Sequence, residues 1–345
     1  MRHLFTGFLL CIVVTGCETI IDLDVADNYE SRLVVISTFS PGKIWTLELS
    51  QSVPFNDSSL YTDAIVSNAT VVILADDGFR DTLKYNANQK IYISVDGNTP
   101  QHGKTYHLQI KAPGFADIEA SSQVPLLSSN LLDVGREPIK IGSLVIPDQF
   151  VARFNIDDEP GRNYYRVTLE RLVSECFSFD TTGSDIVNPD TLYSERNYFQ
   201  SNSPLFHSFP ETVDDPSYPD LQDSYSTAYF SDKLFDGMTR EFSITFTPEI
   251  SRATESIGNH FFLEVSLLSN DLFAHERTVG LHDELVDLPN INQRNPVVVH
   301  SNIQNGFGVF AAYTSAIFMF DEDGNEWQPV GLGAKSGVIV NCDNY

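Results

Sequence analysis

Residues 69–85, with the sequence ATVVILADDGFRDTLKY, decide the fold class of this chain. The stretch opens with a continuous apolar run at residues 71–74 and ends with alternating polar and apolar residues at 81–85. Between them lies Asp-Asp-Gly at residues 76–78, a combination typical of tight turns. A strand, a short turn containing glycine and a returning strand make a β-hairpin. The stretch therefore predicts antiparallel β structure.

Similar strand patterns lie on both sides of this hairpin. Residues 32–38 form a short apolar run, and residues 45–49 and 106–110 alternate between apolar and polar side chains. Alternation with a period of two is the pattern of a half-buried strand. Residues 31–125 would hold about seven short strands at the spacing of a sandwich. We predict an immunoglobulin- or transthyretin-like β-sandwich there.

The rest of the chain, residues 126–345, predicts a larger β-rich domain with one short helical segment. Residues 125–148 are interpreted as a linker that contributes a strand or two. Ser269 or Asn270 can cap the start of the helix, and residues 297–320 return to β. The period-two alternation recurs at three places: Tyr165, Val167 and Leu169; Phe242, Ile244 and Phe246; Phe261, Leu263, Val265 and Leu267.

The N-terminus has the pattern of a bacterial secretion signal. A basic tip at residues 2–3 precedes an uncharged, mostly apolar run, and small residues stand directly before Cys17. Small residues followed by cysteine resemble the lipobox of bacterial lipoproteins, in which the thiol is acylated. The apolar run is too short for a membrane-spanning helix, which needs about 20 residues. We predict a signal peptide over residues 1–16, lipidation of Cys17, and a tether over residues 17–30.

The charge of the chain restricts its partners. It has 47 acidic and 21 basic residues, a formal net charge of −26. A basic footprint for DNA or RNA is absent, so we expect no nucleic-acid partner. The same charge repels an anionic membrane surface, so attachment to a membrane is expected through the lipid anchor.

Two cysteines remain for a disulfide. The chain has four in total, of which Cys11 lies in the predicted signal and Cys17 is the predicted acylation site. Cys176 and Cys342 are therefore a candidate disulfide pair in an exported protein. The alternative is two buried thiols, and the sequence leaves both open.

No catalytic motif is present in the sequence. It contains neither a Gly-x-Ser-x-Gly elbow nor a Walker loop, so we expect no enzyme, no catalytic residues and no cofactor. The acidic stretches at residues 157–159 and 321–325 are interpreted as turns, and we expect no metal site. The alternative of a chelated cation concerns four acids of the polar stretch described next: Asp214, Asp215, Asp220 and Asp223.

Residues 177–226 form a long polar stretch with interleaved aromatic side chains. A structureless stretch of this length is unusual in a compact domain and is generally either functional or disordered. Tyrosine among small polar residues is typical of protein-binding loops. We predict possible partner-binding residues there: Tyr193, Tyr198, Phe199, Tyr218 and Tyr225. The alternative is a loop folded over the sandwich with its rings in the core.

Three further segments carry a family resemblance: NYYRV at residues 163–167, FSDKLFDG at 230–237 and SNIQNGFGVF at 301–310. Together with Cys17 and the Ile-Asp-Leu-Asp that follows it, they resemble the Bacteroidota lipoproteins named domain of unknown function 4249. Asn305 departs from the glycine of that pattern. The resemblance implies an outer-membrane lipoprotein that accompanies a TonB-dependent transporter, and it supplies no catalytic residues.

The expected function follows from the lipobox and this resemblance. We expect a non-catalytic, acylated outer-membrane lipoprotein, on the periplasmic face or the cell surface. Its partner would be a TonB-dependent transporter, which it serves by ligand capture or by direct binding. Two alternatives stay open: a lipid-anchored hydrolase that uses Asp or Glu, and a surface adhesion or structural protein.

Overall fold

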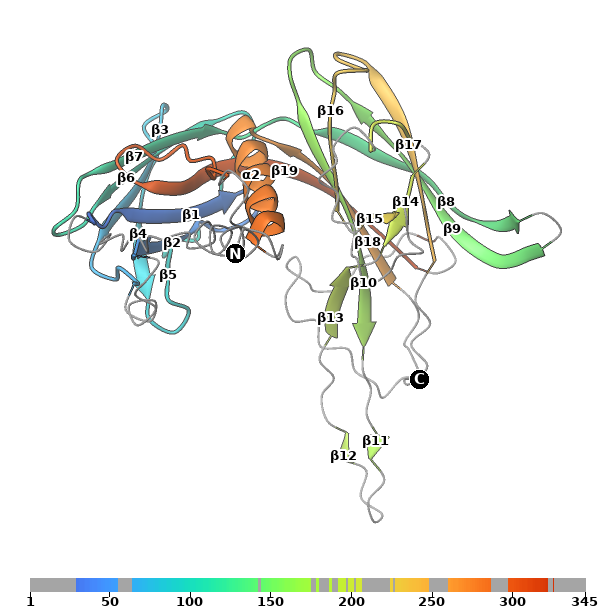
Figure 1. The fold of residues 1–345 in the computed structure, drawn as a ribbon, viewed down its shortest axis with the longest axis horizontal. Helices are drawn as coiled ribbons and strands as arrows, with labels where there is room; N and C mark the ends of the chain where they lie inside the picture. The colour runs from blue at the N-terminus through green and yellow to red at the C-terminus, as the bar shows by residue number, and fades with distance from the viewer. Residues whose placement is uncertain are drawn as a thin grey trace, which may run out of the picture.

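Seven consecutive strands make the N-terminal lobe, on the left of Figure 1. They are β1 (Leu33–Phe39), β2 (Thr46–Gln51), β3 (Thr70–Ala75), β4 (Arg80–Asn86), β5 (Ile91–Ile93), β6 (Thr105–Lys111) and β7 (Ile118–Gln123). Their order in the sheet is β1-β2-β5-β4-β3-β6-β7, with antiparallel neighbours. The predicted hairpin of residues 69–85 is confirmed as β3 and β4, and Gly78 adopts a φ of 90° in its turn.

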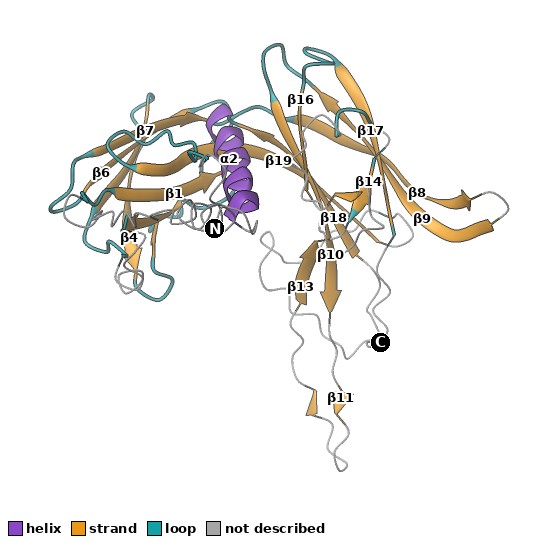
Figure 2. Ribbon diagram, viewed as in Figure 1, coloured by secondary structure: helices purple, strands orange, loops and turns teal. Residues whose placement is uncertain are grey.

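This computed structural model describes most of the chain. The described residues are 29–54, 64–141, 144–174, 178–179, 186–187, 192–196, 198–201, 203–206, 224–225, 227–247, 260–286, 297–321 and 325. They are mostly strands with one α-helix, so the predicted fold class is confirmed (Figure 2). No helix in these ranges is long and apolar enough to cross a membrane.

An aromatic cluster fills the core of the N-terminal lobe. The ring of Trp45, whose residue is 0% exposed, lies 4.6 Å from that of Phe39 and 4.9 Å from that of Tyr106. Phe310, from the far end of the sequence, closes the cluster at 4.6 Å from Phe39. Large buried rings dominate the energetics of such cores. The N-terminal core is thus completed by a C-terminal residue.

Two facing sheets build the C-terminal lobe. One contains β10 (Tyr164–Ser174), β13 (Leu192–Arg196), β16 (Thr227–Ser231) and β18 (His260–Leu268), and the other has the order β15-β14-β17-β9-β8. The strands of the second sheet are β8 (Ser128–Ile141), β9 (Leu144–Asp157), β14 (Phe199–Gln200), β15 (Ser224–Tyr225) and β17 (Thr239–Phe246). A separate pair consists of β11 (Ser178–Phe179) and β12 (Ile186–Val187).

The second core lies between these two sheets. All three predicted apolar alternations, in β10, β17 and β18, point their apolar residues into it. The strands expected within residues 125–148 are confirmed, but the interpretation as a linker is wrong, because residues 128–141 form β8 and residues 144–148 begin β9, and the two strands pair antiparallel. Pro138 lies at a register irregularity of β8, an edge strand, where proline is tolerated.

One strand, β19 (Phe307–Asp321), belongs to both lobes. Its first part pairs in parallel with β1, from Phe307 opposite Val34 to Ala312 opposite Phe39. Its second part pairs antiparallel with β18. The strand therefore joins both lobes in one 12-stranded sheet, and Figure 1 shows it crossing from one lobe to the other. The sequence predicted separate strands here, and a strand at residues 297–299 that the structure does not have.

The helix α2 (Asn270–Val286) begins where the sequence predicts it. The hydroxyl of Ser269 accepts a hydrogen bond from the N–H of Leu272 at 3.4 Å, which makes Ser269 the N-cap. Phe273 stacks on Tyr164 of β10 at 3.9 Å, and the helix packs against β19. Helix α2 thus lies where the two lobes share their common strand.

Candidate functional site

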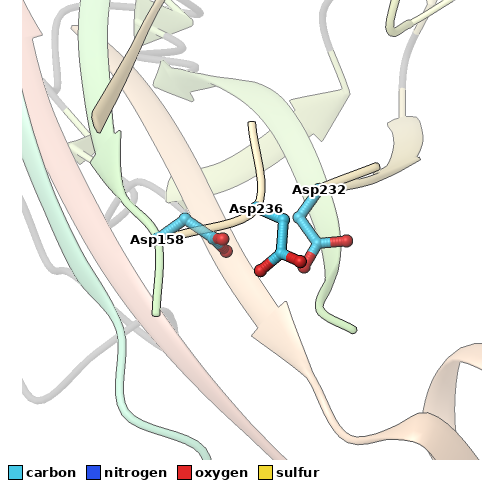
Figure 3. A group of neighbouring side chains, drawn as sticks. All are labelled: Asp158, Asp232 and Asp236. Atoms are coloured by element: carbon cyan, nitrogen blue, oxygen red, sulfur yellow. The ribbon is translucent and has the colours of Figure 1, made fainter. Parts of the chain in front are cut away.

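Two turns meet at one end of the C-terminal lobe. The first, residues 158–163, connects β9 to β10, and the second, residues 231–238, connects β16 to β17. They bring together three acidic residues, Asp158, Asp232 and Asp236, whose carboxylate oxygens lie within 4.8 Å of one another (Figure 3). Two of the motifs singled out in the sequence, at residues 163–167 and 230–237, therefore meet in space.

Each of the three carboxylates binds a backbone N–H of the opposite turn. Asp158 accepts from Gly237 at 2.7 Å, and Asp232 accepts from Asn163 at 2.8 Å. Asp236 accepts from Gly161, also at 2.8 Å. Hydrogen bonds to charged acceptors are stronger than those between neutral groups. The three bonds fasten the turns to each other, and we call residues 158–163 and 231–238 the clamped turns.

Asp158 accepts more hydrogen bonds than Asp232 or Asp236 does. Its Oδ1 also accepts from the hydroxyl of Tyr165 at 2.5 Å and from Nδ2 of Asn163 at 3.1 Å. Burial and the hydrogen bond to the Asp158 carboxylate both raise the pKa of Tyr165 far above its usual value. The phenol therefore stays protonated and remains a donor to Asp158 at all physiological pH values.

Burial and the nearby acids disfavour the charged form of Asp232. Its residue is 3% exposed, and burial, together with the neighbouring Asp158 and Asp236, raises the pKa of its carboxyl. Carboxylate oxygens are ligands that Ca²⁺ prefers, and one oxygen of each acid here also accepts a backbone hydrogen bond. In the described part of the chain the cluster acts as a structural clamp.

The second clamped turn displays apolar side chains to solvent. Phe235 is 1% exposed, and its ring lies 5.6 Å from that of Phe242 in the second core. On either side of it in sequence, Leu234 is 63% exposed and Met238 is 55% exposed. The turn is thus anchored by one apolar residue while two others project from it, and its backbone is fixed by the clamp.

The predicted partner-binding residues lie elsewhere. Phe199 is 1% exposed and packs beside Phe206 in the second core, so it is not a surface contact in this structure. Phe199 therefore follows the alternative prediction, in which the aromatic rings of this stretch pack into the core. Tyr198 is half-buried. Tyr193 lies on β13 and pairs with Val173 of β10. Tyr225 lies on β15 and pairs with Phe199 of β14.

Several predicted positions lie outside the described residues. These are the lipidation site Cys17, the candidate pair Cys176 and Cys342, Tyr218 of the aromatic stretch, and the alternative cation ligands Asp214, Asp215, Asp220 and Asp223. The interpretation of residues 157–159 as part of a turn is consistent with the clamp. Nothing in the local sequence indicates that this turn meets Asp232 and Asp236. The local signal was the Asp-Gly pair at 236–237, which marks a turn.

A mostly β protein of two lobes that share one strand is the class that this architecture defines. Residues 18–317 match the family described as domain of unknown function (DUF4249), and the chain belongs to this family. The match spans both lobes and includes the clamped turns. No curated protein matches the chain.

Asn305 lies in the turn that precedes β19 and keeps it in a conformation that most residues avoid. It adopts a φ of 61°, in the left-handed region that glycine enters freely. Asparagine tolerates this region better than most other residues do. Its Nδ2 also donates to the carbonyl oxygen of Asp117 at 3.1 Å, which ties the turn to the N-terminal lobe.

Proposed function

We propose that this protein is a non-catalytic, acylated outer-membrane lipoprotein that docks on a TonB-dependent transporter as an accessory. The observation that carries the proposal is the second clamped turn, residues 231–238. It holds Leu234 and Met238 in solvent on a backbone that is already fixed. Such a surface serves recognition, because little ordering entropy remains to be lost when a partner binds.

Charge indicates the kind of surface that would receive this turn. The chain carries −26 overall, and Asp157, Glu159 and Asp236 lie on or beside the clamped turns. A complementary partner would offer an apolar depression for Leu234 and Met238, surrounded by basic side chains. Opposite charges across an interface speed association and fix its orientation.

The anchor in this proposal is the acylated Cys17. Its lipobox context in the sequence supports lipidation, and two or more acyl chains are needed for stable anchoring. An acidic protein gains nothing from anionic lipid headgroups. The lipid would therefore hold the protein at the membrane and leave its acidic surface free for a protein partner.

The competing hydrolase hypothesis needs acidic groups that are available to a substrate. Among the described residues, Asp158, Asp232 and Asp236 are the group of three acids whose carboxylate oxygens all lie within 4.8 Å of one another, and each is bound to a backbone amide of the opposite turn. This engagement favours the docking role over acid–base catalysis at this place. Turnover of a glycan or peptide panel, lost on substitution of one Asp or Glu, would favour the hydrolase.

The test is an affinity capture of the tagged, acylated protein from gently solubilised outer membranes, read by mass spectrometry. We expect the wild type to recover a TonB-dependent transporter in stoichiometric amount. The double variant Leu234→Ser, Met238→Ser should recover at least tenfold less, since such anchors contribute about 1–2 kcal/mol each. The matched control is Val95→Ser with Val298→Ser. It changes two exposed apolar residues outside the clamped turns, which are 58% and 84% exposed, and should behave as wild type.

Two outcomes would contradict the proposal at different points. Equal recovery by the Leu234 and Met238 variant would show that the docking surface is elsewhere. Wild type recovered alone would remove the accessory role and favour the adhesion or enzyme alternatives. In parallel, Cys17→Ala should abolish acyl labelling and release the protein from membranes. Labelling that persists would refute the lipobox interpretation.

A further inference from the structure

A pocket of about 480 Å³ lies on the N-terminal lobe, separate from the clamped turns. Its floor is the outer face of the sheet at β3, β6 and β7, and its walls are the start of α2 and residues 302–304. The third sequence motif, at residues 301–310, therefore supplies one wall. Ligand sites of small molecules have volumes of about 300–1,000 Å³, so the size suits a small ligand.

Hydrogen bonds hold the walls of this pocket in place. The N–H of Gln304 donates to the carbonyl oxygen of Glu119 at 2.9 Å, which fastens the motif to β7. The side chain of Asn302 bonds the backbone of Phe310 twice, at 2.8 Å and 3.0 Å. Asp271, in the first turn of α2, lies 3.0 Å from Nε2 of His300. The pocket is preformed by contacts that need no ligand.

Four polar side chains of the lining make no hydrogen bond to the described residues, although Glu119 interacts electrostatically with Lys111 of β6. The four belong to Gln109, Glu119, Ser121 and Gln304, all of which are exposed. Together they offer amide donors, amide and carboxylate acceptors, and a hydroxyl. Leu74 adds an apolar contribution to the floor. Convergent polar groups over a partly apolar floor are typical of a small-molecule site.

The charge of the lining selects among ligands. It includes the acids Glu119 and Asp271 and the imidazole of His107, which lies 3.0 Å from Asp76, and it contains neither lysine nor arginine. The start of a helix favours negative charge, but Asp271 already occupies that position in α2. A phosphate or carboxylate ligand would face two carboxylates without a fixed cation in the lining.

We infer that this pocket binds a small polyhydroxylated molecule without negative charge, of the sugar or polyol class. Hydroxyl groups both donate and accept, which matches the mixed set of amides, carboxylate and hydroxyl. The inference goes beyond the docking role and is independent of it, because a ligand site on the N-terminal lobe requires neither a transporter nor an anchor.

Saturation-transfer NMR on the full mature chain tests the inference. The probes are glucose, galactose, mannose and xylose as neutral sugars, glucosamine as a cationic sugar, and glucuronate as an anionic one, each at millimolar concentration. We expect transfer to at least one neutral or cationic sugar and none to glucuronate. The double variant Gln109→Ala, Gln304→Ala should weaken that binding about tenfold or more, since each lost hydrogen bond costs about 1 kcal/mol.

The control is Gln101→Ala, the same substitution at an exposed glutamine outside the pocket lining. It should bind as the wild type does. A second variant, Ser121→Phe, fills the pocket from an exposed strand position and should abolish transfer while the thermal midpoint stays near that of wild type. No transfer to any sugar, equal transfer to glucuronate, or unchanged binding by the pocket variants would each overturn the inference.

Discussion

The carboxylate of Asp158 accepts a hydrogen bond from the backbone N–H of Gly237 at 2.7 Å, across 79 positions of sequence. The bond connects the turn that leaves β9 with the turn that enters β17. Two similar bonds, from Asn163 to Asp232 and from Gly161 to Asp236, run in the opposite direction. Because donors and acceptors are contributed by both turns, neither turn can move alone without breaking a bond to a carboxylate.

Removing the Asp158 carboxylate should be costly. Asp158→Ala leaves the buried hydroxyl of Tyr165 without its acceptor and frees the N–H of Gly237. We expect a loss of about 2–4 kcal/mol in the free energy of unfolding. Tyr165→Phe alone should cost about 1–2 kcal/mol, because only one bond is lost. Urea unfolding of both single variants and the double variant measures their coupling, which we expect to exceed about 1 kcal/mol. Strictly additive losses would contradict a direct bond.

The stability of the clamp should depend on pH through Asp232. Burial and the two neighbouring acids raise its pKa in the folded state, so the folded protein holds this proton more tightly than the unfolded chain does. The stabilising contribution is complete below the unfolded pKa, about 4, and is lost as the pH rises through the folded pKa.

Asp232→Asn tests this directly, because its amide oxygen can still accept from Asn163. We expect the difference in unfolding free energy, variant minus wild type, to grow as the pH rises from about 4. Thermal unfolding at a series of pH values measures it. The control Asp96→Asn, at an exposed position, should follow wild type throughout. A difference that shrinks with rising pH would show that Asp232 is stabilised as an anion.

A partly buried ion pair fastens α2 to the sheet. Nη1 of Arg166 lies 2.6 Å from Oε1 of Glu276, with side chains 17% and 22% exposed. Glu276→Ala removes the carboxylate bonded to the guanidinium, which keeps Glu264 and the ring of Tyr313 as neighbours, and should cost about 2–3 kcal/mol, below the range for fully buried pairs. The double variant Arg166→Met, Glu276→Met should recover part of that loss, because it removes both charges of the pair but also a cation that the buried Glu264 faces. Denaturant midpoints distinguish these cases, and a double variant less stable than Glu276→Ala would contradict the argument.

Gly308 should tolerate no side chain. It has a φ of 100°, and a Cβ there would lie 1.9 Å from the carbonyl oxygen of Val35 on β1. Gly308→Ala should therefore destabilise the protein by more than about 3 kcal/mol. The matched control is Gly280→Ala in α2, where a Cβ meets nothing within 4 Å, and it should stabilise by up to about 1 kcal/mol. Thermal unfolding of the pair decides the matter; similar midpoints would refute the close approach.

Local patterns predicted the local elements correctly. The hairpin of residues 69–85, the buried face of β10 and the start of α2 at Ser269 depend on residues near one another in sequence, and the structure confirms them. The prediction at residues 297–299 was wrong for a physical reason. Three valines favour a strand, but a strand also needs a partner, and Val298 is 84% exposed.

The long-range features could not be predicted from these patterns. The sequence predicted separate strands within residues 306–320, whereas β19 is continuous and Gly308 lets it approach β1. The contact between the clamped turns is also long-range, because the pairing of β10 with β16 is what brings Asp158 and Asp232 together. Neither acid carries a local sign of the other.

The shared strand also sets the order in which this protein can be completed. Val34 near the start of the chain pairs with Phe307 near its end, and Phe310 fills the N-terminal core. A chain emerging from its N-terminus usually folds its first domain first. Here the N-terminal lobe lacks a strand partner of β1 and the core residue Phe310 until β19 has been synthesised. Neither lobe therefore has its full set of native contacts without β19, and we expect a chain cut short before β19 to lose stability in the half that was synthesised first.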